Sequence, residues 1–150
     1  SFVENKRDID HIRKYICEIN GDLKSIKLLS KIETNLGVDN FKEIIRYSDG
    51  IIIARGDLIP ECGLINSVDK EFDLLLKVKK YEKEKEVIIA THILDNMRKG
   101  IIPNINELES IYTFVNLGVT GFLLASETSI GNYPVKSVEM LKMLINLYKK

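Results

Sequence analysis

The stretch Ser48-Asp49-Gly50-Ile51-Ile52-Ile53-Ala54-Arg55-Gly56-Asp57-Leu58 contains a short apolar run that ends abruptly in charged residues. Such a run between turn signals is typical of a strand buried on both faces, as in a parallel sheet covered by helices. A buried helix could give the same run, but four or five residues are too few to favour one. If the chain stays extended after Ala54, Arg55 and Asp57 point to one side and Gly56 lets a ligand approach the backbone. That corner could bind an anion and a metal, or it could be a surface ion pair beside a turn glycine.

The same pattern of an apolar run followed by polar residues recurs along the chain. Residues 26–33 end with Lys31 and Glu33, two residues apart on one face. Residues 87–90 stop at Thr91-His92, and residues 119–125 stop at Ser126-Glu127-Thr128. Strand ends therefore fall near Val3, Glu33, Asp57, Thr91 and Thr128.

Apolar residues with helical spacing follow each of these strand ends. The positions expected to face inward are Ile9, Ile12, Ile16 and Ile19; Phe41, Ile44 and Ile45; Phe72, Leu75, Leu76 and Lys79; Leu108, Ile111, Tyr112 and Val115; and Val138, Leu141, Ile145 and Tyr148. Residues 60–67 are expected to be irregular. Alternating strands and helices predict βα units with right-handed crossovers and a parallel sheet.

The predicted fold class is α/β, a segment of a parallel (β/α)8 TIM barrel with about five strands. An open doubly wound sheet would also place its site at the carboxyl ends of the strands. The barrel is preferred because four successive strand ends carry polar groups, whereas an open sheet concentrates them at one switch point. Five strands cannot close an eight-stranded barrel, so the barrel is expected to be incomplete.

Composition argues against several classes of function. The 22 basic and 22 acidic side chains leave no positive excess for nucleic acid or an anionic membrane. No apolar run approaches the roughly 20 residues of a membrane span, and the charged first ten residues do not fit a secretory signal. Cys17 and Cys62 form no CxxC motif, so we expect ordinary thiols in a reducing compartment. The chain contains neither GxGxxG nor GxxxxGK[ST].

Four segments together resemble the pyruvate kinase family, in the family's order and at nearly its spacing. Ser30-Lys31-Ile32-Glu33 is similar to the SKIE(N) strand, and residues 48–58 to SDGI(M)VARGDLG. Ala90-Thr91 is similar to AT(Q)ML, and residues 127–134 to SGETAKGxYP. The resemblance covers the whole chain, from the end of barrel strand 4 through the helix after strand 8.

The resemblance implies roles for the strand-end residues. Glu33 and Asp57 would bind Mg²⁺ or Mn²⁺, and Lys31 would neutralise the transferred phosphoryl group. Arg55 and the backbone amides of Gly56 and Asp57 would bind substrate. Thr91 would lie beside the enolpyruvate carbon and take part in its protonation through water. The family also uses K⁺, whose ligands are expected outside this chain.

The chain departs from the family pattern on the nucleotide side of the site. Ile105 replaces the arginine of PTRAE, and Ile130 replaces a lysine that contacts nucleotide. Ile59 replaces a glycine, and Ala125-Ser126 replaces Ser-Gly. The residues for phosphoenolpyruvate are therefore retained better than those for nucleotide.

We therefore expect residues 1–150 to be a partial pyruvate kinase barrel domain without the lid and carboxyl-terminal domains. The parent protein would transfer a phosphoryl group from phosphoenolpyruvate to ADP in glycolysis, giving pyruvate and ATP, in the cytoplasm or an organelle. The isolated chain is expected to be inactive and to self-associate through open sheet edges. One alternative is a non-catalytic phosphoenolpyruvate- and metal-binding or assembly module. A related pyruvate-binding lyase barrel is disfavoured, because such barrels lack this motif set.

Overall fold

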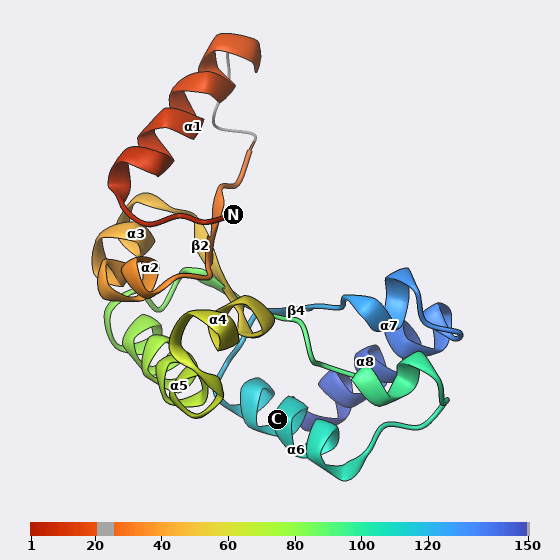
Figure 1. Ribbon diagram of the computed structural model, residues 1–150. Helices are drawn as coiled ribbons and strands as arrows, with labels where there is room; N and C mark the ends of the chain where they lie inside the picture. Colours follow the sequence, from red (N-terminus) through yellow and green to blue (C-terminus); the bar gives the residue numbers. More distant parts are fainter. Residues whose placement is uncertain (21–25, 150) are drawn as a thin grey trace. The chain divides into compact units, whose positions relative to one another are not determined.

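The computed structural model describes residues 1–20 and 26–149, which form an α/β fold (Figure 1). Two compact units divide the chain, Ser1–Ile88 and Ile89–Lys150, with the boundary inside the third strand. The elements, in chain order, are α1 (Lys6–Asn20), β1 (Leu29–Ile32), α2 (Asn35–Asp39), α3 (Phe41–Tyr47), β2 (Gly50–Ala54), α4 (Arg55–Cys62), α5 (Leu64–Tyr81), β3 (Glu86–Ala90), η1 (Asp95–Arg98), α6 (Ile105–Asn116), β4 (Gly121–Leu123), α7 (Ser126–Ser129) and α8 (Pro134–Tyr148).

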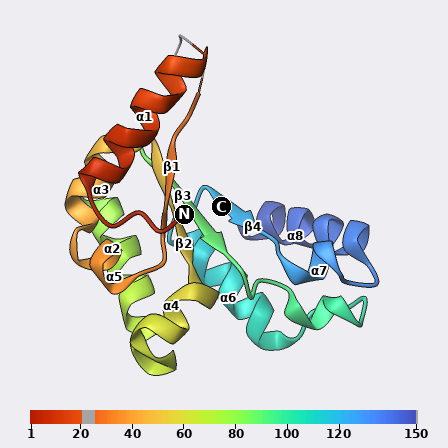
Figure 2. The same ribbon diagram turned by 45° about the horizontal axis from the view of Figure 1, so that its top comes forward.

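The described strands form one four-stranded sheet in the order β1-β2-β3-β4 (Figure 2). β1 and β2 are parallel, with Leu29 opposite Gly50 and Ile32 opposite Ile53. Strand order therefore follows chain order, as successive βα units require. The predicted α/β class with a parallel, unclosed sheet is confirmed for the described residues.

β2 is the buried strand that the opening apolar run predicts. Ile51, Ile53 and Ala54 are each 0% exposed. Polar residues at its start set the register with β1, since Asp49 accepts a hydrogen bond from the Leu28 amide at 2.7 Å and donates its own amide to the Leu28 carbonyl at 2.9 Å. The Ser30 and Ser48 hydroxyls add a buried contact of 2.6 Å.

In the first unit, α3 and α5 bury apolar side chains. α3 buries Phe41, Ile44 and Ile45, as the helical spacing predicts. α5 buries Leu75 as predicted, but Leu76 is 57% exposed while Leu74 and Val78 are buried. The buried stripe also includes Ser67 and Glu71, and a pattern of apolar residues alone misses these polar members.

The predicted irregular segment 60–67 is wrong. α4 runs through Pro60 to Cys62, and α5 begins at Leu64. Only Gly63 separates the two helices, with a φ of 82° that glycine adopts without steric cost. The Arg-Gly-Asp residues thus start a helix instead of extending the strand.

The predicted strand near Val3 is also wrong, because Ser1–Glu4 have no strand conformation. Side chains of the first unit bind this segment instead: the Phe2 amide donates to Glu33 Oε2 at 2.6 Å, and Asn40 Nδ2 donates to the Glu4 carbonyl at 2.8 Å. These two hydrogen bonds hold residues 1–4 in place without strand pairing.

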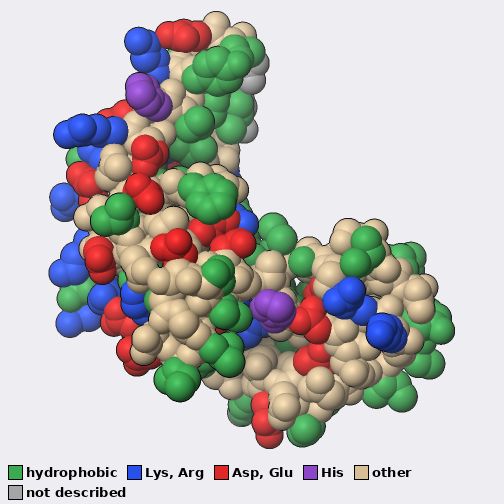
Figure 3. All heavy atoms as spheres, in the orientation of Figure 1, with side chains coloured by type: hydrophobic (Ala, Val, Ile, Leu, Met, Phe, Trp, Pro, Cys, Tyr) green, Lys and Arg blue, Asp and Glu red, His purple; other side chains and the backbone are tan. Residues whose placement is uncertain are grey.

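The apolar face predicted for α1 is buried only in its first turns. Ile9 is 1% exposed, but Ile12 and Ile19 are 47% and 62% exposed. Figure 3 shows hydrophobic side chains on the surface of this helix. No described helix of the chain has the length and apolar character needed to span a membrane.

In the second unit, α6 and α8 bury Ile111 and Phe114, and Leu141 and Leu144, respectively. Tyr112 and Val138, both predicted to face inward, are 44% and 52% exposed. α6 begins with a reciprocal capping box, in which Asn104 and Glu107 each bind the other's backbone amide. β4 is shorter than the predicted 119–125, since it spans only Gly121–Leu123, and α7 begins at Ser126.

We predict that Gly50→Ala destabilises the first unit. A Cβ at this position would lie 2.5 Å from the Glu86 carbonyl oxygen, a backbone atom of β3, and 2.8 Å from Leu29 Cδ2, a side-chain atom of β1. Overpacking of this kind lowers the free energy of unfolding by about 1–3 kcal/mol. Urea unfolding followed by circular dichroism measures the change.

Gly100→Ala is the matched control. An added Cβ there has one neighbour, the Asn96 carbonyl oxygen at 3.6 Å, an ordinary contact distance. Its free energy of unfolding should stay within about 0.5 kcal/mol of the native value. Equal effects of the two substitutions would contradict the close approach of strands at Gly50.

Candidate functional site

The carboxyl ends of β1 and β2 bring together a lysine and two carboxylates. Lys31 Nζ lies 3.1 Å from Asp57 Oδ2 and also contacts Glu33 Oε1. The Glu33 side chain is 1% exposed and that of Asp57 is 47% exposed, so the cluster extends from the core to the surface. Three of the predicted site residues therefore meet at one point.

Local structure explains how each side chain reaches this point. Lys31 and Glu33 are two residues apart where β1 ends, so they project from the same face. The chain then turns directly into α2, whose first residue follows Thr34, and the Thr34 hydroxyl caps that helix by accepting from the Gly37 amide at 3.0 Å. Asp57 lies in the first turn of α4, immediately after β2.

The two carboxylates of the cluster stabilise the positive charge of Lys31. Partial burial lowers the pKa of the Lys31 ammonium, but its contacts with Glu33 and Asp57 outweigh that effect and raise the pKa above the usual value. Lys31 is therefore cationic throughout the physiological range. The second oxygen of Glu33 accepts from the Phe2 amide, so both oxygens of this buried carboxylate have partners.

Glu33 and Asp57 fit a divalent metal as a pair of ligands. Both contact the same ammonium group, so their oxygens lie close together. Mg²⁺ prefers carboxylate oxygens and is usually held by one or two of them together with water and substrate oxygens. The described residues contain no group of three or more His, Cys, Asp or Glu side chains arranged for a metal.

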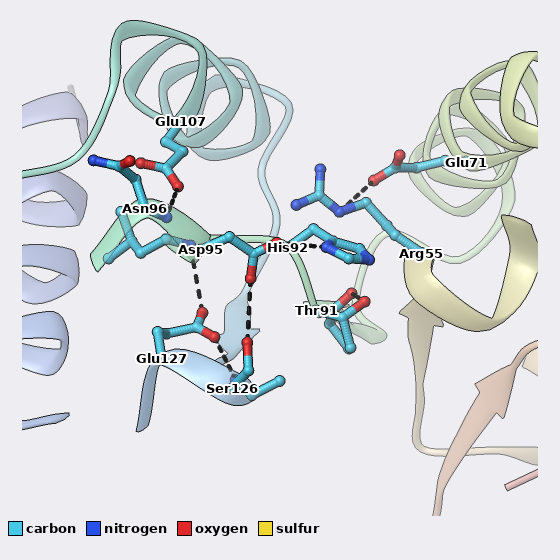
Figure 4. Close-up of polar contacts among 12 residues, drawn as sticks. Arg55, Glu71, Thr91, His92, Asp95, Asn96, Glu107, Ser126 and Glu127 are labelled. Atoms are coloured by element: carbon cyan, nitrogen blue, oxygen red, sulfur yellow. Dashed lines mark hydrogen bonds and ion pairs between the residues drawn. The ribbon is translucent and has the colours of Figure 1, made fainter. Parts of the chain in front are cut away.

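Arg55 does not share a face with Asp57, contrary to the extended conformation that the sequence suggests. The two residues are in the first turn of α4, where positions two apart lie on nearly opposite sides of the helix. Arg55 Nε instead lies 3.8 Å from Glu71 Oε1 of α5 (Figure 4). Gly56 and Asp57 are in the same first turn of α4, and helix amino termini favour anions.

Glu71 is a buried carboxyl that the sequence analysis missed. It is 4% exposed, and its Oε1 has no hydrogen-bond partner among the described residues. Burial raises the pKa of Glu71 to about 7, although the nearby Arg55 charge acts in the opposite direction. Helical spacing relative to Leu74 and Leu75 could have placed Glu71 on the buried face of α5. The first buried residues of that face, Ser67 and Glu71, are polar, so a search for apolar residues does not find them.

The second unit contains Thr91, which follows β3, and Glu127, which lies in α7 after β4. The Thr91 hydroxyl donates to the Ala90 carbonyl at 2.6 Å. Glu127 is completely buried and accepts from the amides of Leu94 and Ala125 at 3.4 and 3.1 Å. Through these hydrogen bonds Glu127 holds the loop after β3 in place. The sequence motif that contains Glu127 does not indicate this contact.

The positions at which the chain departs from the family motifs are on the surface. Ile105 and Ile130 are 65% and 70% exposed, with apolar side chains where the motifs have cations. A surface groove of about 550 Å³ in the first unit is lined by Phe41, Lys42, Glu43, Ile45, Arg46, Tyr47, Tyr81 and Glu82. None of the predicted site residues lines that groove.

Comparison with known proteins agrees with the motifs. A family model described as pyruvate kinase, barrel domain, matches residues 1–138. Pyruvate kinase of Methanocaldococcus jannaschii is 37% identical over 94% of the chain, that of Thermoplasma acidophilum 34% over 95%, and that of Chlamydia muridarum 33% over 100%. The aligned parts are 30%, 25% and 30% of those proteins, so the chain spans less than a third of each.

The raised pKa of Glu71 predicts a pH dependence of stability. Between the ordinary value of 4.5 and about 7 the folded state binds more protons than the unfolded state, so the free energy of unfolding falls as pH rises through this window and levels off above it. The total effect is on the order of 3 kcal/mol. Urea unfolding at a series of pH values from 4.5 to 8 measures this slope.

Glu71→Gln keeps the shape of the side chain and removes its titration, so the slope between pH 5 and 7 should become smaller. Glu84→Gln, at an exposed position, is the control and should leave the slope unchanged. An unchanged slope in Glu71→Gln would show that another group causes the pH dependence.

Proposed function

Because the chain belongs to the pyruvate kinase family, we propose that it carries the phosphoenolpyruvate- and metal-binding part of a barrel that transfers a phosphoryl group from phosphoenolpyruvate to ADP, giving pyruvate and ATP. One observation supports this most directly: Lys31 Nζ contacts the carboxylates of both Glu33 and Asp57. Phosphoryl transfer depends mainly on positioning and on positive charge around the transferred group. A lysine beside two potential metal ligands provides both.

Glu33 and Asp57 would hold Mg²⁺ or Mn²⁺ through their carboxylate oxygens. When bound, the ion supplies positive charge that neutralises phosphoryl and carboxylate oxygens of the substrate. Members of this family generally use K⁺ as well, and we expect its ligands outside this chain. The buried position of Glu33 and its bond from the Phe2 amide would fix one ligand, while the more exposed Asp57 could adjust to the ion.

Lys31 and the first turn of α4 would bind the substrate itself. The Lys31 ammonium would contact the phosphoryl group as it leaves the enol oxygen. The amides of Gly56 and Asp57 would donate to the substrate carboxylate, in keeping with the preference of helix amino termini for anions. Arg55 would add positive charge near this turn, and the ion pair with Glu71 would restrict its side chain.

For Thr91 we propose a place beside the enolpyruvate carbon, where its hydroxyl would take part in protonation through water. This role rests on the match of Ala90-Thr91 to the family motif. A cytoplasmic, glycolytic setting is part of the same proposal.

A non-catalytic binding module is the second candidate function. The exposed Ile105 and Ile130 favour it, because they provide no charge for a nucleotide at positions where the motifs have cations. Such a module would retain the metal and phosphoenolpyruvate residues of the first unit. The two candidates differ in whether bound phosphoenolpyruvate is converted to pyruvate.

We predict that Glu33→Gln and Asp57→Asn each weaken Mn²⁺ binding by at least about tenfold, since each removes one of the two carboxylate ligands proposed here. Electron paramagnetic resonance of free Mn²⁺ measures the binding. Asp73→Asn is a matched control, because Asp73 has the same 47% side-chain exposure as Asp57 and also pairs with a lysine, Lys77. Equal Mn²⁺ affinity in all three variants would refute the metal site.

We also predict that the isolated chain forms no pyruvate from phosphoenolpyruvate, ADP, Mg²⁺ and K⁺ above background. One electrostatic contact to a transition state contributes about 3–4 kcal/mol, so losing the charges replaced by Ile105 and Ile130 slows the reaction by on the order of 10⁴-fold or more. Pyruvate formation is measured by coupled oxidation of NADH. Turnover that Lys31→Met abolishes would contradict this expectation and support an enzyme that works without those cations.

A further inference from the structure

Helix α4, which carries Asp57, is too short to hold its direction without its neighbours. It spans eight residues, Arg55–Cys62, of which only Leu58 is buried. Pro60 lies inside the helix and has no amide hydrogen to donate to the Gly56 carbonyl. Isolated helices of this length are unstable in water, so the direction of α4 depends on contacts with other elements.

Two hydrogen bonds join the last turn of α4 to the start of α2. Asn35 is the first residue of α2, and its Nδ2 donates to the Glu61 carbonyl at 2.6 Å. The Asn35 backbone amide also donates to Glu61 Oε2 at 3.2 Å. Lys70 of α5 donates to Asn35 Oδ1, which fixes the orientation of the carboxamide. We call the doubly bonded pair the Asn35–Glu61 clamp, and it lies where α4 contacts α2 (Figure 1).

The clamp is close in sequence to both of the proposed metal ligands. Asn35 follows Glu33 by two residues, and Glu61 follows Asp57 by four, one helical turn along the same face of α4. The end of β1 and α4 are therefore joined at two points, by the ion pair of Lys31 with Asp57 and by the clamp. Two separate contacts fix the direction of a short helix, whereas a single contact leaves it free to pivot.

We propose that Asn35 and Glu61 are positioning residues for the divalent metal, because they hold α4 so that the Asp57 carboxylate stays beside that of Glu33. This inference rests on the proposed function, which assigns Glu33 and Asp57 as ligands. Neither clamp residue touches the ion. Ligands that are already oriented lose less conformational freedom on binding, so the clamp raises affinity without adding a contact to the metal.

The clamp acts in a state in which the Lys31 ion pair is weakened. A divalent cation beside Glu33 and Asp57 repels the Lys31 ammonium and competes with it for the same carboxylate oxygens. The contact that holds Asp57 in the metal-free protein then loses strength. The clamp is one helical turn away and its Asn35 side chain is uncharged, so it still holds α4 when the ion is bound.

Asn35→Ala tests the proposal. The substitution removes the hydrogen bond from Nδ2 to the Glu61 carbonyl and should weaken Mn²⁺ binding by about 3- to 10-fold, as expected for the loss of one hydrogen bond. Electron paramagnetic resonance of free Mn²⁺ measures the affinity. Asn116→Ala is the matched control and should leave the affinity unchanged, because Asn116 Nδ2 also donates to a backbone carbonyl, that of Tyr112, at 2.8 Å in an exposed hydrogen bond.

Two variants of Glu61 distinguish positioning from a direct effect of charge. Glu61→Gln keeps a side-chain oxygen that can accept from the Asn35 amide, so the Mn²⁺ affinity should stay within about twofold of the native value. Glu61→Ala has no such oxygen and should weaken binding by about 3- to 10-fold. Equal weakening in both variants would show that the negative charge of Glu61 attracts the ion, and it would overturn the positioning role.

Urea unfolding of each variant separates the loss of the clamp from a general loss of structure. Native stability together with weaker Mn²⁺ binding in Asn35→Ala is the expected result. If Asn35→Ala does not fold, the Glu61 variants decide the question, since Glu61 is exposed and its truncation leaves no cavity.

The outcomes also separate this inference from the proposed function. If Glu33→Gln and Asp57→Asn weaken Mn²⁺ binding while folded Asn35→Ala and Glu61→Ala bind it with native affinity, the positioning role is refuted and the metal site stands. If the native chain binds no Mn²⁺, or binds it no better than Glu33→Gln and Asp57→Asn do, the metal site of the proposed function fails and the inference fails with it.

Discussion

The ammonium group of Lys31 is the interaction on which the site of the first unit depends. A buried carboxylate such as Glu33 is costly unless it is paired and hydrogen-bonded, and a second carboxylate nearby adds repulsion. Lys31 offsets both effects because it contacts Glu33 and Asp57 together, and the Phe2 amide satisfies the remaining oxygen of Glu33. Two acids can therefore lie close together at adjacent strand ends.

Carboxylates also organise the loops that follow the strands, by accepting from backbone amides. Asp49 fixes the entry to β2, and Glu107 and Glu127 fix the loop after β3. Hydrogen bonds between an ionised acceptor and an amide are stronger than neutral ones, so a few buried acids can hold segments that have little apolar surface of their own. Loops held in this way can keep residues such as His92, whose φ is 53°, in a left-handed conformation that a flexible loop would relax.

Patterns within a few residues predicted the parts of the fold that depend on local chemistry. The apolar run 51–54 predicted a buried strand, and the spacing of Phe41, Ile44 and Ile45 predicted the buried face of a helix, as observed. The same reasoning was only partly right for α5, where Leu75 is buried as predicted but the buried face also includes Ser67 and Glu71. It failed for α1 because apolar residues with correct spacing do not ensure a neighbour to cover them, as Ile12 and Ile19 show.

The sequence by itself determined the family of the chain, its four described strands, and the presence of Lys31, Glu33 and Asp57 at strand ends, since these follow from motifs and from alternation along a strand. Only the tertiary structure decided the partners of the charged groups. It turned Arg55 toward Glu71 instead of leaving it beside Asp57, and it joined His92 to Asp95 and Ser126. The physical reason is that a side chain's partner depends on where the helix begins after the strand and on which distant element packs against it, and neither is encoded in local periodicity.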